Sequence, residues 1–136
     1  MASITVQPFT LKDVALSLGS DDYAAHVDQV TFTPASSTTT WTGLKSNTFT
    51  DVSTATWTVT LNYAQDWTTE DSLSLYLFEN EGETVTATFK PRAGVGPSFT
   101  ADLVITPGAI GGTVNQVATA SVTLGVDGKP VLIPAA

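Results

Sequence analysis

The sequence predicts a mostly β domain of the α+β class with a single α-helix at about residues 69–80. Apolar and hydroxyl-bearing side chains alternate with a period of two along most of the chain, as in strands that bury one face. The 136 residues include 24 threonines, and threonine and valine favour strands over helices. Only one segment combines helix-capping residues with a helical spacing of leucines.

Four segments alternate most regularly and are predicted to be strands. In the first of them, Trp57, Val59, Leu61 and Tyr63 share one face, and threonines with Asn62 share the other. Each such segment should bury its apolar face and expose its hydroxyl face. The four segments are residues 56–63, 84–90, 99–105 and 120–126. Weaker strand candidates are residues 9–18, 27–33, 40–44 and 131–133.

Glycine and proline mark the predicted turns. Asp127-Gly128 is a two-residue hairpin signal that would join the strand ending at Val126 to the C-terminal strand. Residues 91–97 and 107–112 are predicted loops. Neither loop has the glycine spacing of a phosphate-binding site.

The helix prediction depends on its two ends. Thr68 is the expected N-cap, and acidic residues follow it where the helix dipole favours them. Leu73 and Leu77 then lie one turn apart, and Gly82 can end the helix. Residues 73–78 also alternate like a strand, but the cap and the terminator favour a helix.

Residues 34–55 form a long polar segment in which Trp41, Leu44 and Phe49 are spaced apart. Loops of this length are uncommon in compact domains unless they function. One interpretation is an arm that orders against a partner, with these three residues as inter-subunit contacts. The other is an ordinary hairpin that packs the same residues on its own core. The sequence leaves both open.

Composition argues against several kinds of function. The 5 Lys and Arg residues against 13 Asp and Glu give a net charge of −8, so stable binding to nucleic acid is not expected. The absence of cysteine excludes disulfides and thiolate chemistry. The low charge, 13% of residues, fits either a surface covered by identical neighbours or the surface of a secreted β-module.

No catalytic, cofactor or metal site is predicted. His26 is the one histidine, and no G-x-S-x-G turn is present to supply a nucleophile. Acidic residues 79, 81 and 83 could be imagined as a glycosidase pair, and Asp21, Asp22 and Asp28 as a weak calcium site. Solvated turns are the simpler interpretation of both groups, and the protein is not expected to be an enzyme.

Three tryptophans raise a rival function, because exposed aromatic rings can stack on sugars. Trp57 alternates with core residues, and Trp67 precedes the helix, so both are expected to pack internally. Only Trp41 remains as a sugar platform. A secreted carbohydrate-binding sandwich therefore stays an alternative.

The order of elements resembles the major tail tube proteins of long-tailed, siphovirus-type bacteriophages. The resemblance covers about residues 55–130. It consists of the strand Trp57–Tyr63, then residues 73–78 with the acidic turn 79–83, the strands 85–89 and 99–105, and the segment 117–124 ending near Gly128-Lys129-Pro130.

The resemblance implies a two-sheet β-sandwich or barrel with one flanking helix, built as a single domain over residues 1–136 with the arm at 34–55. It further implies hexameric rings that stack head to tail into the tail tube, a conduit for DNA ejection. The partners would be the protein itself and tape-measure, tail terminator and baseplate proteins, and DNA would pass through the lumen without stable binding. A capsid decoration or tail-fibre module is the alternative within virions.

The location implied is the virion tail, after synthesis in the host cytoplasm. No apolar run approaches the roughly 20 residues that span a bilayer, and the first six residues lack the pattern of a signal peptide. No membrane association is expected.

Overall fold

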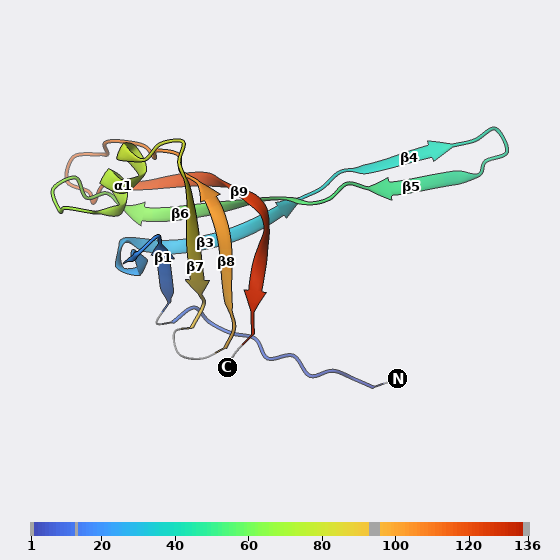
Figure 1. Ribbon diagram of the computed structural model, residues 1–136, viewed down its shortest axis with the longest axis horizontal. Coiled ribbons are helices and arrows are strands. Elements are labelled where there is room, and N and C mark those ends of the chain that lie inside the picture. Colours follow the sequence, from blue (N-terminus) through green and yellow to red (C-terminus); the bar gives the residue numbers. More distant parts are fainter. Residues whose placement is uncertain (1, 13, 93–95, 135–136) are drawn as a thin grey trace.

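The computed structural model describes residues 2–12, 14–92 and 96–134 and contains nine strands, one α-helix and one 3-10 helix (Figure 1). The elements are β1 (Ala15–Leu18), β2 (Asp21–Asp22), η1 (Ala24–His26), β3 (Val27–Ala35), β4 (Thr38–Thr42), β5 (Thr48–Val52), β6 (Thr56–Ala64), α1 (Leu73–Glu79), β7 (Thr84–Lys90), β8 (Ser98–Val104) and β9 (Thr119–Ile133). The predicted mostly β class with one flanking helix is confirmed.

Seven strands form one antiparallel sheet in the order β2-β1-β7-β8-β9-β6-β3, and β4 and β5 form a separate two-stranded sheet. The large sheet bends so that β3 and β6 run across β7 and β8, as Figure 1 shows. Two layers therefore pack face to face although they belong to one sheet, in the manner of an orthogonal sandwich. Its outer strands β2 and β3 do not pair with each other, so the sheet is not a closed barrel.

Strand β9 makes the bend possible because it belongs to both layers. Its first half pairs with β6 from Thr119 to Gly125, and its last residues, Val131 to Ile133, continue along β8. Between these parts the register along β8 shifts, so that residues 128–130 lie opposite Ala101. Gly128 has a φ of +88° there, a conformation that glycine adopts without strain.

The predicted hairpin at Asp127-Gly128 is therefore wrong. The dipeptide forms a bulge inside one 15-residue strand. The chain does not turn back on itself because β8 already offers a partner for Val131 to Ile133. Such a distant partner is invisible to a local turn signal.

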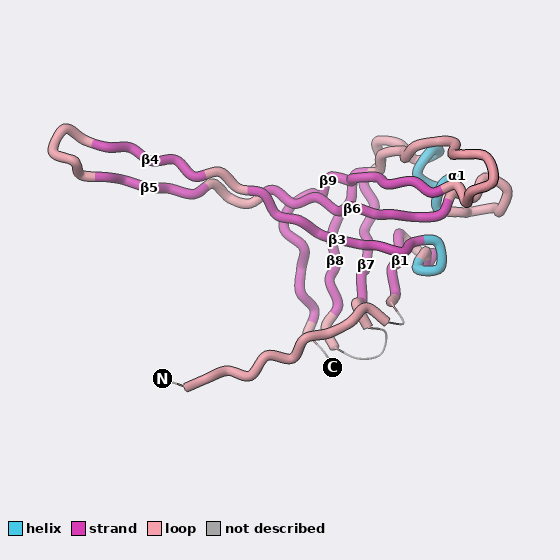
Figure 2. Tube along the Cα trace, turned by 180° about the vertical axis from the view of Figure 1, so that it is seen from behind, coloured by secondary structure: helices cyan, strands magenta, loops and turns pink. Residues whose placement is uncertain are grey.

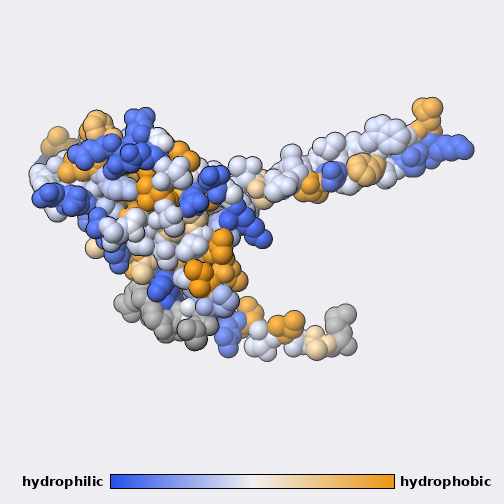
Figure 3. Space-filling model, in the orientation of Figure 1, coloured by the Kyte–Doolittle hydropathy of each residue, from blue (hydrophilic) through white to orange (hydrophobic). Residues whose placement is uncertain are grey.

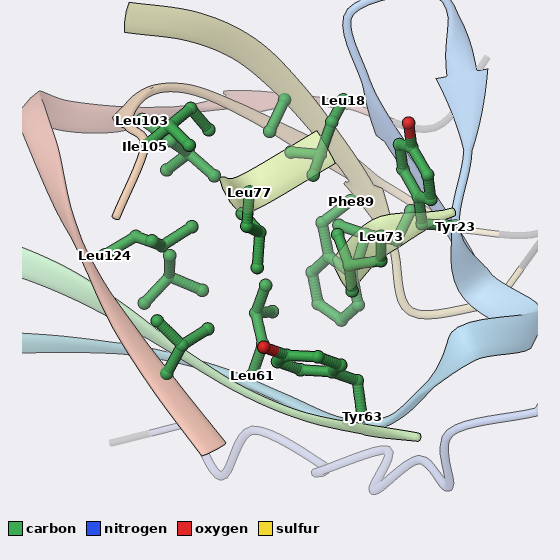
Figure 4. Close-up of a cluster of buried hydrophobic side chains, with 14 of the residues drawn as sticks. Leu18, Tyr23, Leu61, Tyr63, Leu73, Leu77, Phe89, Leu103, Ile105 and Leu124 are labelled. Carbon is green, nitrogen blue, oxygen red and sulfur yellow. The ribbon is translucent and has the colours of Figure 1, made fainter. Parts of the chain in front are cut away.

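The core lies between the two layers and under α1 (Figure 4). Strands β6, β7, β8 and β9 bury the faces that alternation predicted. Full burial of a leucine or valine side chain contributes about 1.5–3 kcal/mol, so this face fixes the register of every strand. The most deeply buried side chains include Leu16, Leu18, Val59, Leu61, Leu73, Leu77, Leu103, Ile105 and Leu124.

Helix α1 is shorter than predicted, and its N-cap is Ser72 rather than Thr68. The Asp66 carboxylate accepts hydrogen bonds from the N–H groups of Thr68 and Thr69, which turns the chain before the helix. Asp71 then takes a φ of +63°. The helix can begin only after this reversal, so Ser72 accepts from the Leu75 N–H at 3.5 Å.

The weaker strand candidates each overlap a strand, but the bounds of these strands differ from the predicted ones. Only residues 15–18 of the segment 9–18 are a strand, and residues 2–10 have no regular structure. β4 ends at Thr42, two residues before the predicted end. The predicted loop at 91–97 lies partly outside the described residues. Across the described part of the chain, no helix has the length and apolar character needed to cross a membrane.

Candidate assembly surfaces

Residues 36–55 project from the domain as a hairpin, here called the arm (Figures 1 and 2). The antiparallel pairing of β3 with β6 ends at Ala35 and Thr56, and that of β4 with β5 begins at Thr38 and Val52. At this root the Ser37 N–H donates to the Ser53 Oγ at 2.8 Å, and the Ser53 N–H donates to the Ser37 carbonyl at 2.8 Å. The arm is thus a continuation of two core strands.

The arm carries the three residues predicted as contact candidates, and none of them packs on the core. Trp41 and Phe49 lie directly opposite each other and are 60% and 61% exposed, while Leu44 at the tip is fully exposed. The segment is therefore a hairpin, as in the second interpretation, but it projects from the domain and leaves these residues exposed instead of packing them on the core. Large apolar side chains left in solvent are typical of interaction sites.

The tip of the arm is held by its own backbone. The Gly43 N–H donates to the Asn47 carbonyl at 2.7 Å, and the Ser46 N–H donates to the Gly43 carbonyl at 3.0 Å. Ser46 adopts a φ of +63°, which completes the turn. Leu44 and Lys45 are presented by this turn, at the point farthest from the core.

An apolar groove of about 730 Å³ opens between the two layers, on the side from which the arm projects. Sequence reasoning missed it because its walls come from six separate segments that only the folded chain brings together. Its rings include Phe32 and Phe89, whose centroids are 5.9 Å apart. Orange, hydrophobic atoms mark this region below the root of the arm in Figure 3. The lining residues include Phe9, Val30, Phe32, Trp57, Phe89, Phe99 and Leu132.

The N-terminal segment, residues 2–11, borders the groove and then leaves the domain. Phe9 and Leu11 line the groove yet are still 64% and 44% exposed. Ile4 and Val6 lie farther out and are 93% and 80% exposed. The arm and the N-terminal segment both project from this side of the domain, as Figures 1 and 2 show.

The end of the domain that holds α1 presents a second apolar surface. Phe78 is 55% exposed and meets Trp67 edge-on, with ring centroids 6.1 Å apart. Gln65 joins this pair to the loop 107–118: its Oε1 accepts from the Trp67 Nε1–H at 3.1 Å and from the Gly111 N–H at 3.0 Å. The loop itself exposes Ile110, Val114 and Val117.

Gly108 allows the loop 107–118 to lie close to the core. A Cβ built on Gly108 would come within 1.9 Å of the buried Tyr63 hydroxyl oxygen, so only glycine fits at this point. The loop is therefore held at both sides of Ile110, by Tyr63 and by Gln65. Its exposed apolar residues have a defined place beside α1.

Carboxylates surround the same end, here called the acidic end. Burial, together with the Asp21 carboxylate, raises the pKa of Tyr23 to about 12, and Asp71 contributes to the same rise. Burial, with Glu83 and Asp21, also raises the pKa of Tyr76. Three separate segments therefore bring negative charge to the two tyrosines. The exposed acids of this end are Asp21, Asp22, Glu70, Asp71, Glu79, Glu81 and Glu83.

One of the five Lys and Arg residues lines the groove, and three more adjoin its lining residues in the chain. Lys129 lines it directly. Lys12 and Arg92 pair in an isolated β-bridge, next to the lining residues Leu11 and Pro91. Lys90 lies between Phe89 and Pro91. These four residues are here called the basic rim.

The outward face of β3, β6 and β9 is mostly hydroxyl- and amide-bearing, and Asp28 and Asp127 are its charged residues. Thr31, Thr60 and Thr123 lie opposite one another across the three strands, and the Thr60 and Thr123 hydroxyls are 3.3 Å apart. In the next row the Asn62 Nδ2 donates to the Gln29 Oε1 at 2.7 Å. This is the predicted hydroxyl-bearing face.

Two of the residues considered for catalysis or metal binding, His26 and Asp22, accept hydrogen bonds from backbone N–H groups near the start of a helix. The His26 Nδ1 accepts from the Leu73 N–H at 3.4 Å, at the start of α1, and its ring meets Tyr23 edge-on. Asp22 accepts from the Ala24 N–H at 2.9 Å and so holds the start of η1. Within residues 2–12, 14–92 and 96–134, no group of three or more potential ligands is placed to hold a metal ion.

Two of the three tryptophans pack against other residues of the domain and one is exposed, as the sequence suggested. Trp57 is half-buried against the core and lines the groove, and Trp67 packs on Phe78. Trp41 alone stands free, on the arm. Its neighbour across the strands is Phe49, so the two rings form one apolar site on a narrow hairpin.

Three solved structures share this fold over nearly their whole length. The first, a chain of the sheath–tube complex of an extracellular contractile injection system (PVC), is 12% identical with a TM-score of 0.67, and the match covers 93% of this chain and 92% of that one. The second, from the anti-feeding prophage cap that terminates the tube, is 16% identical with a TM-score of 0.66 and coverages of 98% and 97%.

The third is a chain of the PVC sheath/tube terminator in its extended state. It is 15% identical with a TM-score of 0.63, and the match covers 95% of this chain and 99% of that one. No family model matches the sequence, and neither does any curated protein. At these identities the likeness establishes a shared fold, which is that of chains in phage-tail-like injection particles.

Proposed function

We propose that the protein is a structural subunit that self-assembles into the tube of a phage-tail-like particle. The observation that carries the proposal is the full-length match to chains of tube and tube-terminating assemblies. The exposed arm, the open groove and the hydroxyl-bearing face of β3, β6 and β9 support it independently. A lone monomer gains nothing from leaving such apolar surfaces in water.

Within this function we propose hexameric rings that stack head to tail. Strand β3 is an outer strand of the large sheet, and the short β2 is the other. Unpaired edges of this kind readily add a strand from another chain. Six copies joined edge to edge would close a ring without any edge exposed, and the tube would be a stack of such rings.

The lumen would let DNA or another cargo pass without binding it. The net charge of −8 repels a polyanion, and the hydroxyl-bearing face of β3, β6 and β9 offers no cluster of cations to hold one. Tape-measure, terminator and baseplate proteins are the partners we propose beside the protein itself. The neighbours come from contractile systems, so the proposal is not restricted to siphovirus-type tails.

We propose that Trp41, Leu44 and Phe49 of the arm are inter-subunit contacts. The arm extends two core strands, so a contact at its tip is mechanically joined to the core. Its three large apolar residues are exposed in the single chain. Cover by another subunit would remove this apolar surface from water.

A tube-terminating subunit is the second candidate. Two of the three structural neighbours are chains of a terminating cap and of a terminator, with coverage of at least 95% on both sides. A terminator would form one ring and stop, because only one of its faces would accept another ring.

Negative-stain electron microscopy of the concentrated protein tests the proposal. Hollow tubes built of six-fold rings are expected for a tube subunit. Isolated six-fold rings at every concentration would identify the terminator instead. A protein that stays monomeric in analytical ultracentrifugation, and that does not add to pre-formed rings of its own tail, would contradict both.

A further inference from the structure

Opposite charges lie at opposite ends of the domain. The acidic end holds seven exposed carboxylates, and all five Lys and Arg residues lie elsewhere. The basic rim holds four of those five. Asp102 and Asp127, which pair across β8 and β9, lie on the outward face of these strands and line a shallow pocket there together with Lys129. Among the described residues, no carboxylate lines the groove itself.

Each end also exposes apolar side chains. The acidic end presents Phe78, 55% exposed, beside Ile110, 67% exposed. The groove presents the rings of Phe32 and Phe99, both half-buried, and Leu132, 56% exposed. An apolar projection ringed by acids and an apolar groove ringed by bases match in both polarity and charge.

The two surfaces face away from each other. Figures 1 and 2 place α1 and the loop 107–118 at one extreme of the domain, and the arm and the N-terminal segment on the opposite side. The groove opens on the side of these two projections (Figure 3). One copy can therefore use its groove and its acidic end at the same time, which is the condition for an open, repeating contact.

We propose that the groove of one copy receives the acidic end of a second copy, with Phe78 and Ile110 against the groove and the acidic end against the basic rim. The proposal rests on the proposed function, since it supplies the head-to-tail contact by which one ring stacks on the next. The arm and the N-terminal segment of the receiving copy would enclose the second copy from two sides.

Charge favours this occupant over the arm of a second copy. The arm carries one cation, Lys45, and one anion, Asp51, and so has no net charge to match the basic rim. The acidic end carries seven negative charges and no positive one. Like charges brought together across an interface cost several kcal/mol in general, so reversing either surface should separate the copies.

Exchange of charge between the two surfaces tests the contact. One variant, Arg92→Glu with Lys129→Glu, cancels the net charge of the basic rim, and the other, Glu70→Lys with Glu79→Lys, reduces the negative charge of the acidic end. Each variant alone is expected to associate at least about tenfold more weakly than the wild type in sedimentation velocity at low salt. The equimolar mixture is expected to recover association, because the unchanged acidic end of the first variant then meets the unchanged basic rim of the second.

Arg92→Lys with Lys129→Arg is the matched control, since it changes the same two side chains and keeps their charge. Its association at low salt is expected to stay within about threefold of the wild type. Wild-type association should weaken as NaCl rises from about 0.05 to 0.5 M, because the screening length falls well below 10 Å over this range. Thermal melts of every variant verify that the domain still folds.

The proposal is overturned if both variants associate alone like the wild type, or if two folded variants fail to recover on mixing. Morphology separates this outcome from that of the proposed function. Association that recovers on mixing but never produces tubes would sustain the contact and reject the tube. Tubes that form equally well from either variant alone would sustain the tube and reject the contact.

Cross-linking gives an independent answer if a double variant does not fold. The chain has no cysteine, so Glu79→Cys and Lys129→Cys proteins each carry a single thiol. A mixture of the two is expected to give a disulfide-linked heterodimer under mild oxidation. Preferential linkage of Lys129→Cys to a Leu44→Cys protein would show that the arm occupies the groove instead, and would overturn the proposal.

Discussion

At the scale of single residues, the start of α1 depends on two short polar side chains. Asp66 accepts from the Thr68 and Thr69 N–H groups. Hydrogen bonds from Thr69, through its side chain and then its backbone, together with the Thr68 N–H, hold the pKa of the Asp66 carboxyl well below its usual range. The Ser72 hydroxyl donates to the Asp66 carbonyl at 2.5 Å, so the loop and the helix cap form one network.

We expect Ser72→Ala to lower the free energy of unfolding by about 1–2 kcal/mol, the usual cost of removing a serine N-cap. The side chain is almost fully buried, so the Asp66 carbonyl and the Leu75 N–H would both lose a partner. Urea unfolding followed by tryptophan fluorescence measures the change.

Thr68→Ala is the matched control, because Thr68 is the cap that the sequence suggested. Its exposed hydroxyl contacts only Asp66, at 3.1 Å, and the change should cost less than about 0.5 kcal/mol. A larger effect at Thr68 than at Ser72 would contradict the cap assignment.

At the scale of elements, alternation predicted the strands well because burial enforces it. β6 and β7 begin at Thr56 and Thr84, where the pattern places them, since a slip of one residue would turn every buried side chain outward. The bulge in β9 could not be predicted in this way. It depends on β8, a strand at least fifteen residues away in sequence, and local patterns carry no information about such a partner.

The candidate surfaces were predictable only where their residues lie close together in the sequence. Trp41, Leu44 and Phe49 could be singled out because they lie within one polar segment. The groove could not, since Phe32, Phe89 and Leu132 come together only through the bend of the sheet. The two charged ends are hidden in sequence for the same reason, because the residues of the basic rim come from three separate segments around Lys12, Lys90 and Lys129.

We expect replacement of residues 36–55 by a two-residue turn to leave a folded domain that no longer forms tubes. The arm contributes no residue to the buried core, and Ala35 and Thr56 already lie opposite each other in the β3–β6 ladder. A two-residue Asn-Gly turn can close that end. Circular dichroism and electron microscopy measure folding and assembly.

The triple variant Trp41→Ser, Leu44→Ser and Phe49→Ser separates the length of the arm from its chemistry. It keeps the hairpin but removes its large apolar groups, and it should also block assembly if these residues are contacts. Tubes formed by the deletion variant would contradict the proposed role of the arm. Tubes formed by the serine variant alone would assign that role to the arm backbone.

At the scale of the whole molecule, the domain combines a closed core with surfaces that a single copy cannot cover. The core is fully covered by α1 and the two layers. The arm, the N-terminal segment, the groove and the acidic end, in contrast, all leave large apolar side chains exposed. These four surfaces are distributed around the domain rather than gathered on one face. Such a distribution suits a subunit with neighbours on several sides more than a binary complex.

Assembly should therefore change which peptide bonds a protease can reach. Trypsin cleaves after lysine and arginine except before proline, so Lys90-Pro91 and Lys129-Pro130 are resistant by sequence. Lys45 lies in the exposed turn at the tip of the arm, and exposed loop tips are preferred sites of cleavage. In the free subunit we expect cleavage after Lys45 to be among the first events.

In assembled tubes we expect cleavage after Lys45 to be at least about tenfold slower, because a covered tip must first detach from its neighbour before it can enter the protease. Mass spectrometry of fragments 1–45 and 46–136 follows both states, and Lys45→Gln provides the uncleavable control. Equal rates in tubes and in free subunits would mean that the tip of the arm remains in solvent. The inter-subunit contact would then have to lie along the strands of the arm, where Trp41 and Phe49 face each other.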